Sequence, residues 1–165
     1  MLNIPVPRPA ATAPGSRPPA RAAATLTLLV LAVLALLTGC GGVSESVASA
    51  VKDSSSAVAT ARIALRQDMD GKLTRSAAVT SLDDELKEIQ TSRSTVLKLS
   101  PATEQDRATQ RQALEVLDRC AAGFATARAA LAADEGGTPS LSDGDKALAD
   151  AQDALKQLED KVGQK

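Results

Sequence analysis

Few side chains in this sequence are of types that carry out covalent chemistry or bind metal ions. Histidine is absent, which removes the commonest general base and the commonest metal ligand. Serine–histidine and cysteine–histidine catalytic pairs are therefore excluded. The groups that remain are two cysteines, Cys40 and Cys120, a Ser-x-x-Lys spacing at residues 49–52, and acidic stretches at residues 68–70 and 83–88.

Ser49 and Lys52 have the spacing with which a lysine activates a serine nucleophile in some acyl-transfer enzymes. The further motifs of such a site, Ser-Asp-Asn and Lys-Thr-Gly, do not occur in the sequence. A chain that reads as helical throughout also lacks the sheet on which such a site is built. We therefore expect no catalytic role for this pair.

The first acidic stretch resembles a fragment of an EF-hand calcium loop. With Gly71 aligned to the invariant glycine of that loop, Arg66 takes the first ligand position and Ala77 takes the position of the bidentate glutamate. Neither residue supplies a carboxylate. We therefore expect Asp68 and Asp70 to form an acidic helix end, closed by Gly71 as a left-handed cap.

The second acidic stretch comprises Asp83, Asp84, Glu85 and Glu88, with Lys87 inside it. Such a run is typical of a solvated helix face, and loose binding of a divalent cation is the alternative. Asp83 lies four residues before Lys87, which is the favourable order for an ion pair on a helix surface. The sequence therefore predicts no metal site here and an Asp83–Lys87 pair.

Cys120 lies next to an apolar stripe of its predicted helix. We expect a buried structural thiol at this position, because an unpaired cysteine behaves as a small apolar side chain. A disulfide between two copies of the chain is the alternative.

The first 39 residues differ in composition from the rest of the chain. Residues 1–21 contain six prolines and three arginines but no acidic residue, and an apolar run follows at residues 26–37. A basic start before an apolar run of this length is typical of a secretory signal. We therefore expect residues 1–39 to direct export across a membrane.

Leu37, Thr38, Gly39 and Cys40 stand at the end of that apolar run. These four residues resemble the lipobox of bacterial lipoproteins, which ends in the cysteine that carries the lipid. The resemblance implies a diacylglyceryl group on the Cys40 thiol and cleavage by signal peptidase II after Gly39, with Leu37 and Thr38 completing its recognition site. It also implies a location at the cell membrane, lipid-anchored on the extracytoplasmic face. An uncut transmembrane anchor and an ordinary cleaved signal peptide are the alternatives.

The chain then divides into a signal peptide at residues 1–39, a lipidated cysteine with a flexible tether at residues 40–46, and a folded domain at residues 47–165. From Cys40 onward, the chain has 126 residues with 16 basic and 20 acidic side chains. A weakly acidic chain with mixed charges lacks the basic face that phosphate binding requires, so we expect no nucleic acid partner.

Helices are predicted throughout the domain, over residues 44–70, 74–99, 100–134 and 142–165. Mostly apolar residues recur in each at alternating spacings of three and four, which is the pattern of a helix seam. In chain order, the four predicted stripes are Val47, Val51, Ser54, Val58, Ala61 and Leu65; Val79, Leu82, Leu86, Ile89, Arg93 and Val96; Leu114, Leu117, Ala121, Phe124, Arg128 and Leu131; and Leu148, Ala151, Leu155, Leu158 and Val162. The third helix is expected to begin at Ser100-Pro101, with Ser100 as its N-cap, and the fourth at Ser142. Phe124 is the only aromatic residue, so the core must be built largely from alanine, leucine, valine and isoleucine.

We therefore expect an all-α fold, a small antiparallel helical bundle of four helices, or three. A long open coiled coil that oligomerises is the alternative. Arg93 and Arg128 fall on stripe positions, so we expect them near the bundle ends with their charged heads in water. A role in binding a partner is the alternative for these two arginines.

The function expected from these features is that of a non-enzymatic binding or scaffolding module of the cell envelope, with no cofactor. Its partners would be the membrane, through the lipid on Cys40, and an envelope protein or cell-wall component. The alternatives are a self-associating coiled-coil spacer between membrane and wall, which would be a homo-oligomer, a carrier of a small apolar ligand, and an enzyme that uses carboxylates.

Overall fold

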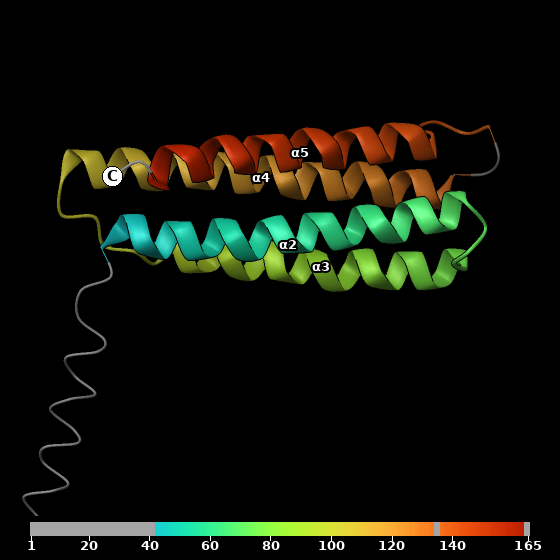
Figure 1. Cartoon of the computed structure of the whole chain (residues 1–165), viewed down its shortest axis with the longest axis horizontal. Helices are drawn as coiled ribbons and strands as arrows, with labels where there is room; N and C mark the ends of the chain where they lie inside the picture. The colour runs from blue at the N-terminus through green and yellow to red at the C-terminus, as the bar shows by residue number, and fades with distance from the viewer. Residues whose placement is uncertain (1–41, 134–135, 164–165) are drawn as a thin grey trace, which may run out of the picture. The chain divides into compact units, whose positions relative to one another are not determined.

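The computed structural model describes residues 42–133 and 136–163, which contain helices and no strand. The helices are α2 (Val43–Met69), α3 (Arg75–Leu97), α4 (Glu104–Ala132) and α5 (Leu141–Gly163). They run antiparallel in succession, joined by short connections (Figure 1). The prediction of an all-α antiparallel bundle is confirmed, with four helices.

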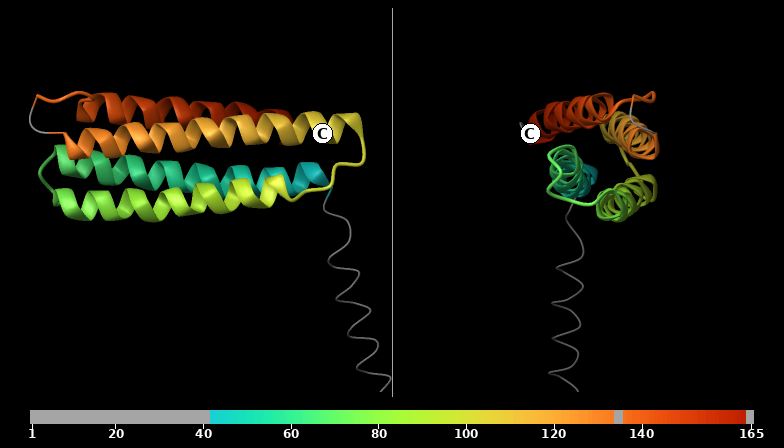
Figure 2. Two further views of the ribbon diagram at one scale, coloured as in Figure 1. Left: turned by 180° about the vertical axis from the view of Figure 1, so that it is seen from behind. Right: turned by 90° about the vertical axis from the view of Figure 1, so that its right-hand side faces the viewer.

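The four helices close into a ring in which each packs against the next and α5 returns to α2 (Figure 2). One diagonal is shorter than the other, because α2 also contacts α4. The bundle has two ends, which we name by their connections. The near end holds the start of α2 and residues 98–103, and the far end holds residues 70–74, the end of α4 and the start of α5 (Figure 1).

The helix that follows the second connection begins later than predicted. Ser100 is not its N-cap, because Thr103 takes that position and accepts a hydrogen bond from the backbone N–H of Asp106 at 3.0 Å. The Asp106 carboxylate in turn accepts from the Thr103 backbone N–H at 3.3 Å, which completes a capping box. This reciprocal pair gives hydrogen-bond partners to two backbone N–H groups, those of Thr103 and Asp106. Ser100 followed by Pro101 would give partners to fewer backbone N–H groups.

The other ends of the helices lie close to their predicted positions. Gly71 has a φ of +67°, as a left-handed cap requires, and the turn is closed by the Lys72 N–H, which donates to the Gln67 carbonyl at 2.8 Å. Helix α5 begins one residue earlier than predicted, because Ser140 forms a second capping box with Asp143.

The predicted tether is longer than the structure allows. Helix α2 begins at Val43, so residues 43–46, which the sequence assigned to a flexible tether, form its first turn. The serines of this turn are compatible with a helix here because its apolar stripe, beginning at Val47, packs into the core.

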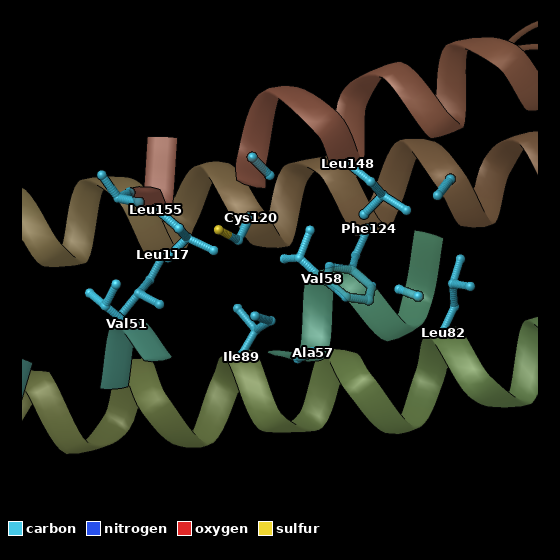
Figure 3. Close-up of a cluster of buried hydrophobic side chains, with 14 of the residues drawn as sticks. Val51, Ala57, Val58, Leu82, Ile89, Leu117, Cys120, Phe124, Leu148 and Leu155 are labelled. Carbon is cyan, nitrogen blue, oxygen red and sulfur yellow. The ribbon is translucent and has the colours of Figure 1, made fainter. Parts of the chain in front are cut away.

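The core is built mainly from aliphatic side chains, as the composition predicts (Figure 3). The stripe predicted for α2 is buried at every position: Val47, Val51, Ser54, Val58, Ala61 and Leu65. The stripe predicted for α5 is equally well placed, and only its last member, Val162, is half-buried. Phe124 and Cys120 point from α4 into the space between the helices (Figure 3).

The stripes of α3 and α4 are partly shifted from their predicted positions. Leu82, Ile89 and Val96 of α3 are buried as predicted, but Ala78 and Ser92 are buried in place of their neighbours Val79 and Arg93. In α4 the same shift puts Ala113, Cys120 and Ala127 in the core, beside the correctly predicted Leu117, Phe124 and Leu131. At the shifted positions a small side chain is buried, and the larger neighbours Val79 and Leu114 are only partly buried.

Helices α4 and α5 approach each other closely at two glycines, Gly123 and Gly144. A Cβ atom on Gly123 would lie 3.0 Å from the carbonyl oxygen of Ala147, and one on Gly144 would lie 3.0 Å from the Cα atom of Ala127. Both neighbours are backbone atoms, so a side chain at either glycine would push the two helices apart.

Candidate functional site

The residues predicted to carry the lipid anchor, Leu37, Thr38, Gly39 and Cys40, lie outside the described residues. Lipid attachment and signal peptidase recognition therefore stay predictions. The nearest described element is α2, whose first residue, Val43, follows Cys40 by three positions. Any anchor on Cys40 would thus be joined to the near end of the bundle by a very short stretch of chain.

A hollow at the far end has a volume of about 540 Å³. Asp68 and Arg75 lie in its wall, together with Ser140 and Ser142 at the start of α5. The Arg75 Nε atom is 3.2 Å from Asp68 Oδ2, and its Nη1 donates to the Leu131 carbonyl at 3.1 Å. Arg75 therefore joins the ends of α2 and α4, and its charge is already matched by Asp68.

The acidic stretch at the end of α2 is held by cations of this chain. The Asp68 side chain is only 4% exposed and faces Arg75, and Asp70 forms an ion pair with Lys72 at 2.9 Å. With Gly71 in the left-handed conformation, this arrangement is the acidic helix end that the sequence predicts.

Three polar side chains on α2 and α5 form a network that sequence reasoning missed. Asp145 accepts hydrogen bonds from Arg66 Nε and Nη2, both at 3.0 Å, and from Arg62 Nε at 3.2 Å. The sequence placed Asp145 only at the positive end of a helix dipole. The signal that could have indicated more is the four-residue spacing of Arg62 and Arg66, which puts two cations on one helix face.

This network makes folding depend on the ionisation of Asp145. Partial burial by itself would raise the pKa of the Asp145 carboxyl, but the hydrogen bonds from Arg66 and Arg62 outweigh it and lower that pKa. A carboxyl whose pKa is lower in the folded state stabilises the fold above its unfolded pKa, and this stabilisation is lost as pH falls through the folded pKa.

We expect Asp145→Asn to lower the free energy of unfolding by about 1 kcal/mol at neutral pH, because Arg66 and Arg62 lose their charged partner and Arg62 keeps only its hydrogen bond to Gln152. The difference from the wild type should shrink as the pH falls from about 4, the usual pKa of an unfolded aspartate, through the lower folded pKa of Asp145. Denaturant unfolding across that pH range measures it. Asp150→Asn on the exposed face of α5 is the matched control, and an equal loss in both variants at neutral pH would contradict the network.

Two ion pairs connect α3 and α4. Arg93 Nε lies 2.6 Å from Asp118 Oδ1, and Arg128 Nε lies 2.7 Å from Asp83 Oδ1. Arg93 follows Asp83 by ten residues and Asp118 precedes Arg128 by ten, so both pairs fit one antiparallel register. The two arginines lie near helix ends as predicted, but their heads meet carboxylates of the neighbouring helix.

The second acidic stretch is divided among different contacts. The predicted Asp83–Lys87 pair is wrong, because Asp83 turns toward α4 and Lys87 donates to Asp84 at 2.8 Å. Partial burial, with the nearby charges of Glu88 and Asp84, raises the pKa of Glu85. Among the described residues, no group of three or more acidic or cysteine side chains is arranged to hold a metal ion.

The structure does not bring Ser49 and Lys52 together at one site. Ser49 lines a shallow groove of about 260 Å³ between α2 and α3, where Asp53 and Glu88 are also found. Lys52 is exposed and does not line this groove. The groove is lined by hydroxyl groups and two carboxylates, and it holds no activated nucleophile.

Cys120 is fully buried in the core, which confirms the prediction of a buried thiol. Burial raises the pKa of this thiol to about 12. Because the thiolate is the reactive form of cysteine, Cys120 is protonated and unreactive at neutral pH.

None of the helices in the described ranges is both long enough and apolar enough to cross a bilayer. No family model, curated protein or solved structure matches this chain. Its function must therefore be inferred from the chemistry of its own residues.

Proposed function

We propose that this protein is a lipid-anchored lipoprotein on the extracytoplasmic face of the cell membrane. In this proposal, its helical bundle is a non-enzymatic binding or scaffolding module of the envelope. The anchor is the diacylglyceryl group on Cys40 that the lipobox residues imply. Its partner beyond the membrane is an envelope protein or a cell-wall component, bound on the outer surface of the bundle.

The observation that carries this proposal is the position of α2 relative to Cys40. Helix α2 begins three residues after that cysteine, so the folded domain starts almost at the predicted cleavage site. This arrangement suits a bundle held directly on a membrane by its N-terminal residue. With α4 29 residues long, the far end would stand about 40 Å above the near end at 1.5 Å per residue.

The packing of the bundle favours a surface role over the alternatives. The apolar stripes of the four helices face one another inside one chain, so they are not available to form a long coiled coil with other copies. The hollows of the described part border polar side chains at the surface. A carrier of an apolar ligand would instead need an apolar pocket.

The test is metabolic labelling with a radioactive fatty acid. We expect the wild type and Cys120→Ala to be labelled and to sediment with membranes. We expect Cys40→Ala to carry no label and to keep residues 1–39, because signal peptidase II cleaves before the lipid-bearing cysteine. Labelling of Cys40→Ala, or recovery of the intact chain in the cytosol, would reject the proposal.

The spacer alternative is tested by light scattering on residues 42–165. A compact monomer supports the binding module. An elongated oligomer supports the self-associating spacer.

A further inference from the structure

The groove between α2 and α3 collects hydrogen-bond acceptors from both helices, which lie side by side (Figure 1). It is lined by the carboxylates of Asp53 and Glu88 and by hydroxyl groups that include those of Ser49, Thr91 and Ser92. Its volume of about 260 Å³ is below the roughly 300 Å³ at which pockets for drug-sized ligands begin. The groove therefore suits a single side chain of a larger partner.

The two carboxylates of this groove are not balanced by cations of the bundle. Neither Asp53 nor Glu88 forms an ion pair within the part of the chain that the structure describes. The lysine that precedes each of them does not compensate. Lys87 donates to Asp84 at 2.8 Å, and Lys52 does not line the groove. The groove thus carries an unmatched negative charge from each helix.

The charge of Glu88 also acts on the next turn of α3. Partial burial raises the pKa of Glu85, and the charges of Glu88 and Asp84 raise it further. Negative charge therefore accumulates along this side of α3, and a cation bound beside Glu88 would reduce the repulsion.

A nearly buried hydroxyl group at the bottom of the groove has no partner. Ser92 is 6% exposed and lines the groove, yet its Oγ atom forms no hydrogen bond within the described residues. The usual partner of such a hydroxyl is a carbonyl of the preceding helix turn. The Thr91 hydroxyl has this partner, since it donates to the Lys87 carbonyl at 2.9 Å. Because a buried hydroxyl without a hydrogen bond costs free energy, Ser92 favours a ligand that supplies one.

These groups define the chemistry of the ligand. A carboxylate can only accept hydrogen bonds, and the Thr91 oxygen can only accept because its hydrogen is used. The ligand must therefore donate hydrogen bonds and carry positive charge. An ammonium group has three N–H donors that point in different directions, which suits acceptors on two helices and at the bottom of the groove. A planar guanidinium group instead favours the two oxygens of one carboxylate.

We propose that the groove between α2 and α3 binds a lysine side chain of a partner protein. The ammonium group donates to the carboxylates of Asp53 and Glu88 and to Ser92 Oγ. This inference deepens the proposed function and rests on it, because it identifies the partner of the binding module as an envelope protein with an exposed lysine.

The test is a titration of ¹⁵N-labelled residues 42–165, followed by their amide chemical shifts. This segment contains all four helices and every core residue of the described part. The probe is a short alanine peptide with one central lysine, blocked at both ends. We expect it to shift the amides of residues 49–53 and 88–92 at millimolar concentration. The same peptide with acetyl-lysine, which lacks the charge, should not, and the arginine peptide should bind several-fold more weakly.

Variants of the groove should weaken the binding of the lysine peptide. Asp53→Asn and Glu88→Gln should each do so by about threefold, as for an exposed charge pair, and the double variant by about tenfold. Ser92→Ala should weaken it by about threefold through the lost hydrogen bond. The matched controls are Ser94→Ala and Asp150→Asn, at exposed positions that do not line the groove. Both should bind the peptide as the wild type does.

Absence of shifts at the groove, or equal shifts with the acetyl-lysine peptide, would overturn the inference. Shifts spread equally over the acidic residues of α5 would also overturn it, since any acidic surface would then serve. The segment 42–165 lacks Cys40, so this binding does not depend on the anchor. Failure of the fatty acid labelling would thus reject the proposed location, while the titration still decides whether the groove binds lysine.

Discussion

Phe124→Ala is expected to lower the free energy of unfolding by about 3–5 kcal/mol, because it removes the largest side chain of the core and leaves a cavity. Phe124 is fully buried and is the only aromatic residue of the chain. Its ring lies between α4 and α2, near Val58 (Figure 3). A core built from small aliphatic side chains on rigid helices has little freedom to close the gap, so the loss should fall toward the upper end of this range.

Denaturant unfolding followed by far-ultraviolet circular dichroism measures this loss, since the chain has no tryptophan or tyrosine to report it by fluorescence. Phe124→Leu, which fills part of the space, should lose less. Leu97→Ala removes an exposed side chain and should change the stability little. If Phe124→Ala cost no more than Leu97→Ala, the described core would be wrong.

The helices of the bundle could be predicted because their boundaries depend on local chemistry. Gly71 stops α2 through a backbone conformation that glycine adopts readily. The start of α4 was the exception, and it too has a local cause: Thr103 is followed three residues later by Asp106, and this capping box takes precedence over Ser100-Pro101. A capping pair is thus a stronger signal than a serine before a proline.

The stripes of α3 and α4 could be predicted only in part. There the larger apolar residue of a neighbouring pair is not the one that the core buries. Sequence periodicity favours the larger apolar residue of each neighbouring pair, as with Val79 over Ala78 and Leu114 over Ala113. The structure buries the alanines and leaves the larger residues at the edge. Close packing of helices requires small residues at the points of contact, and that requirement depends on the neighbouring helix.

The polar contacts between helices could not be predicted, since each joins residues far apart in the sequence. Asp145 faces Arg62 and Arg66 of α2, and Gln110 caps the end of α3. Periodicity and helix-end preferences describe one helix at a time and give no information on such partners. The resemblance to a lipobox is the opposite case: its four residues are contiguous, so the prediction of an anchor at Cys40 rests on the sequence alone.

Gly123→Leu is expected to lower the free energy of unfolding by about 3 kcal/mol, the upper part of the usual range for overpacking. Even the first side-chain carbon would lie 3.0 Å from the carbonyl oxygen of Ala147 and 3.6 Å from the Cβ atom of Ala151. The carbonyl belongs to the backbone of α5, so it can move only if the two helices separate. Separation would also loosen the neighbouring close contact at Gly144, where a Cβ atom would lie 3.0 Å from Ala127.

The matched control is Ala125→Leu, two residues away on the exposed face of α4. Leucine is a better helix former than the glycine it replaces at position 123 and a slightly poorer one than the alanine it replaces at position 125. Helix propensity alone would therefore make Gly123→Leu stabilising and Ala125→Leu almost neutral. Steric contact with α5 predicts the opposite order, with a large loss only at Gly123. Denaturant unfolding of the two variants separates these causes, and a stabilised Gly123→Leu would show that α4 and α5 are not packed as closely as described.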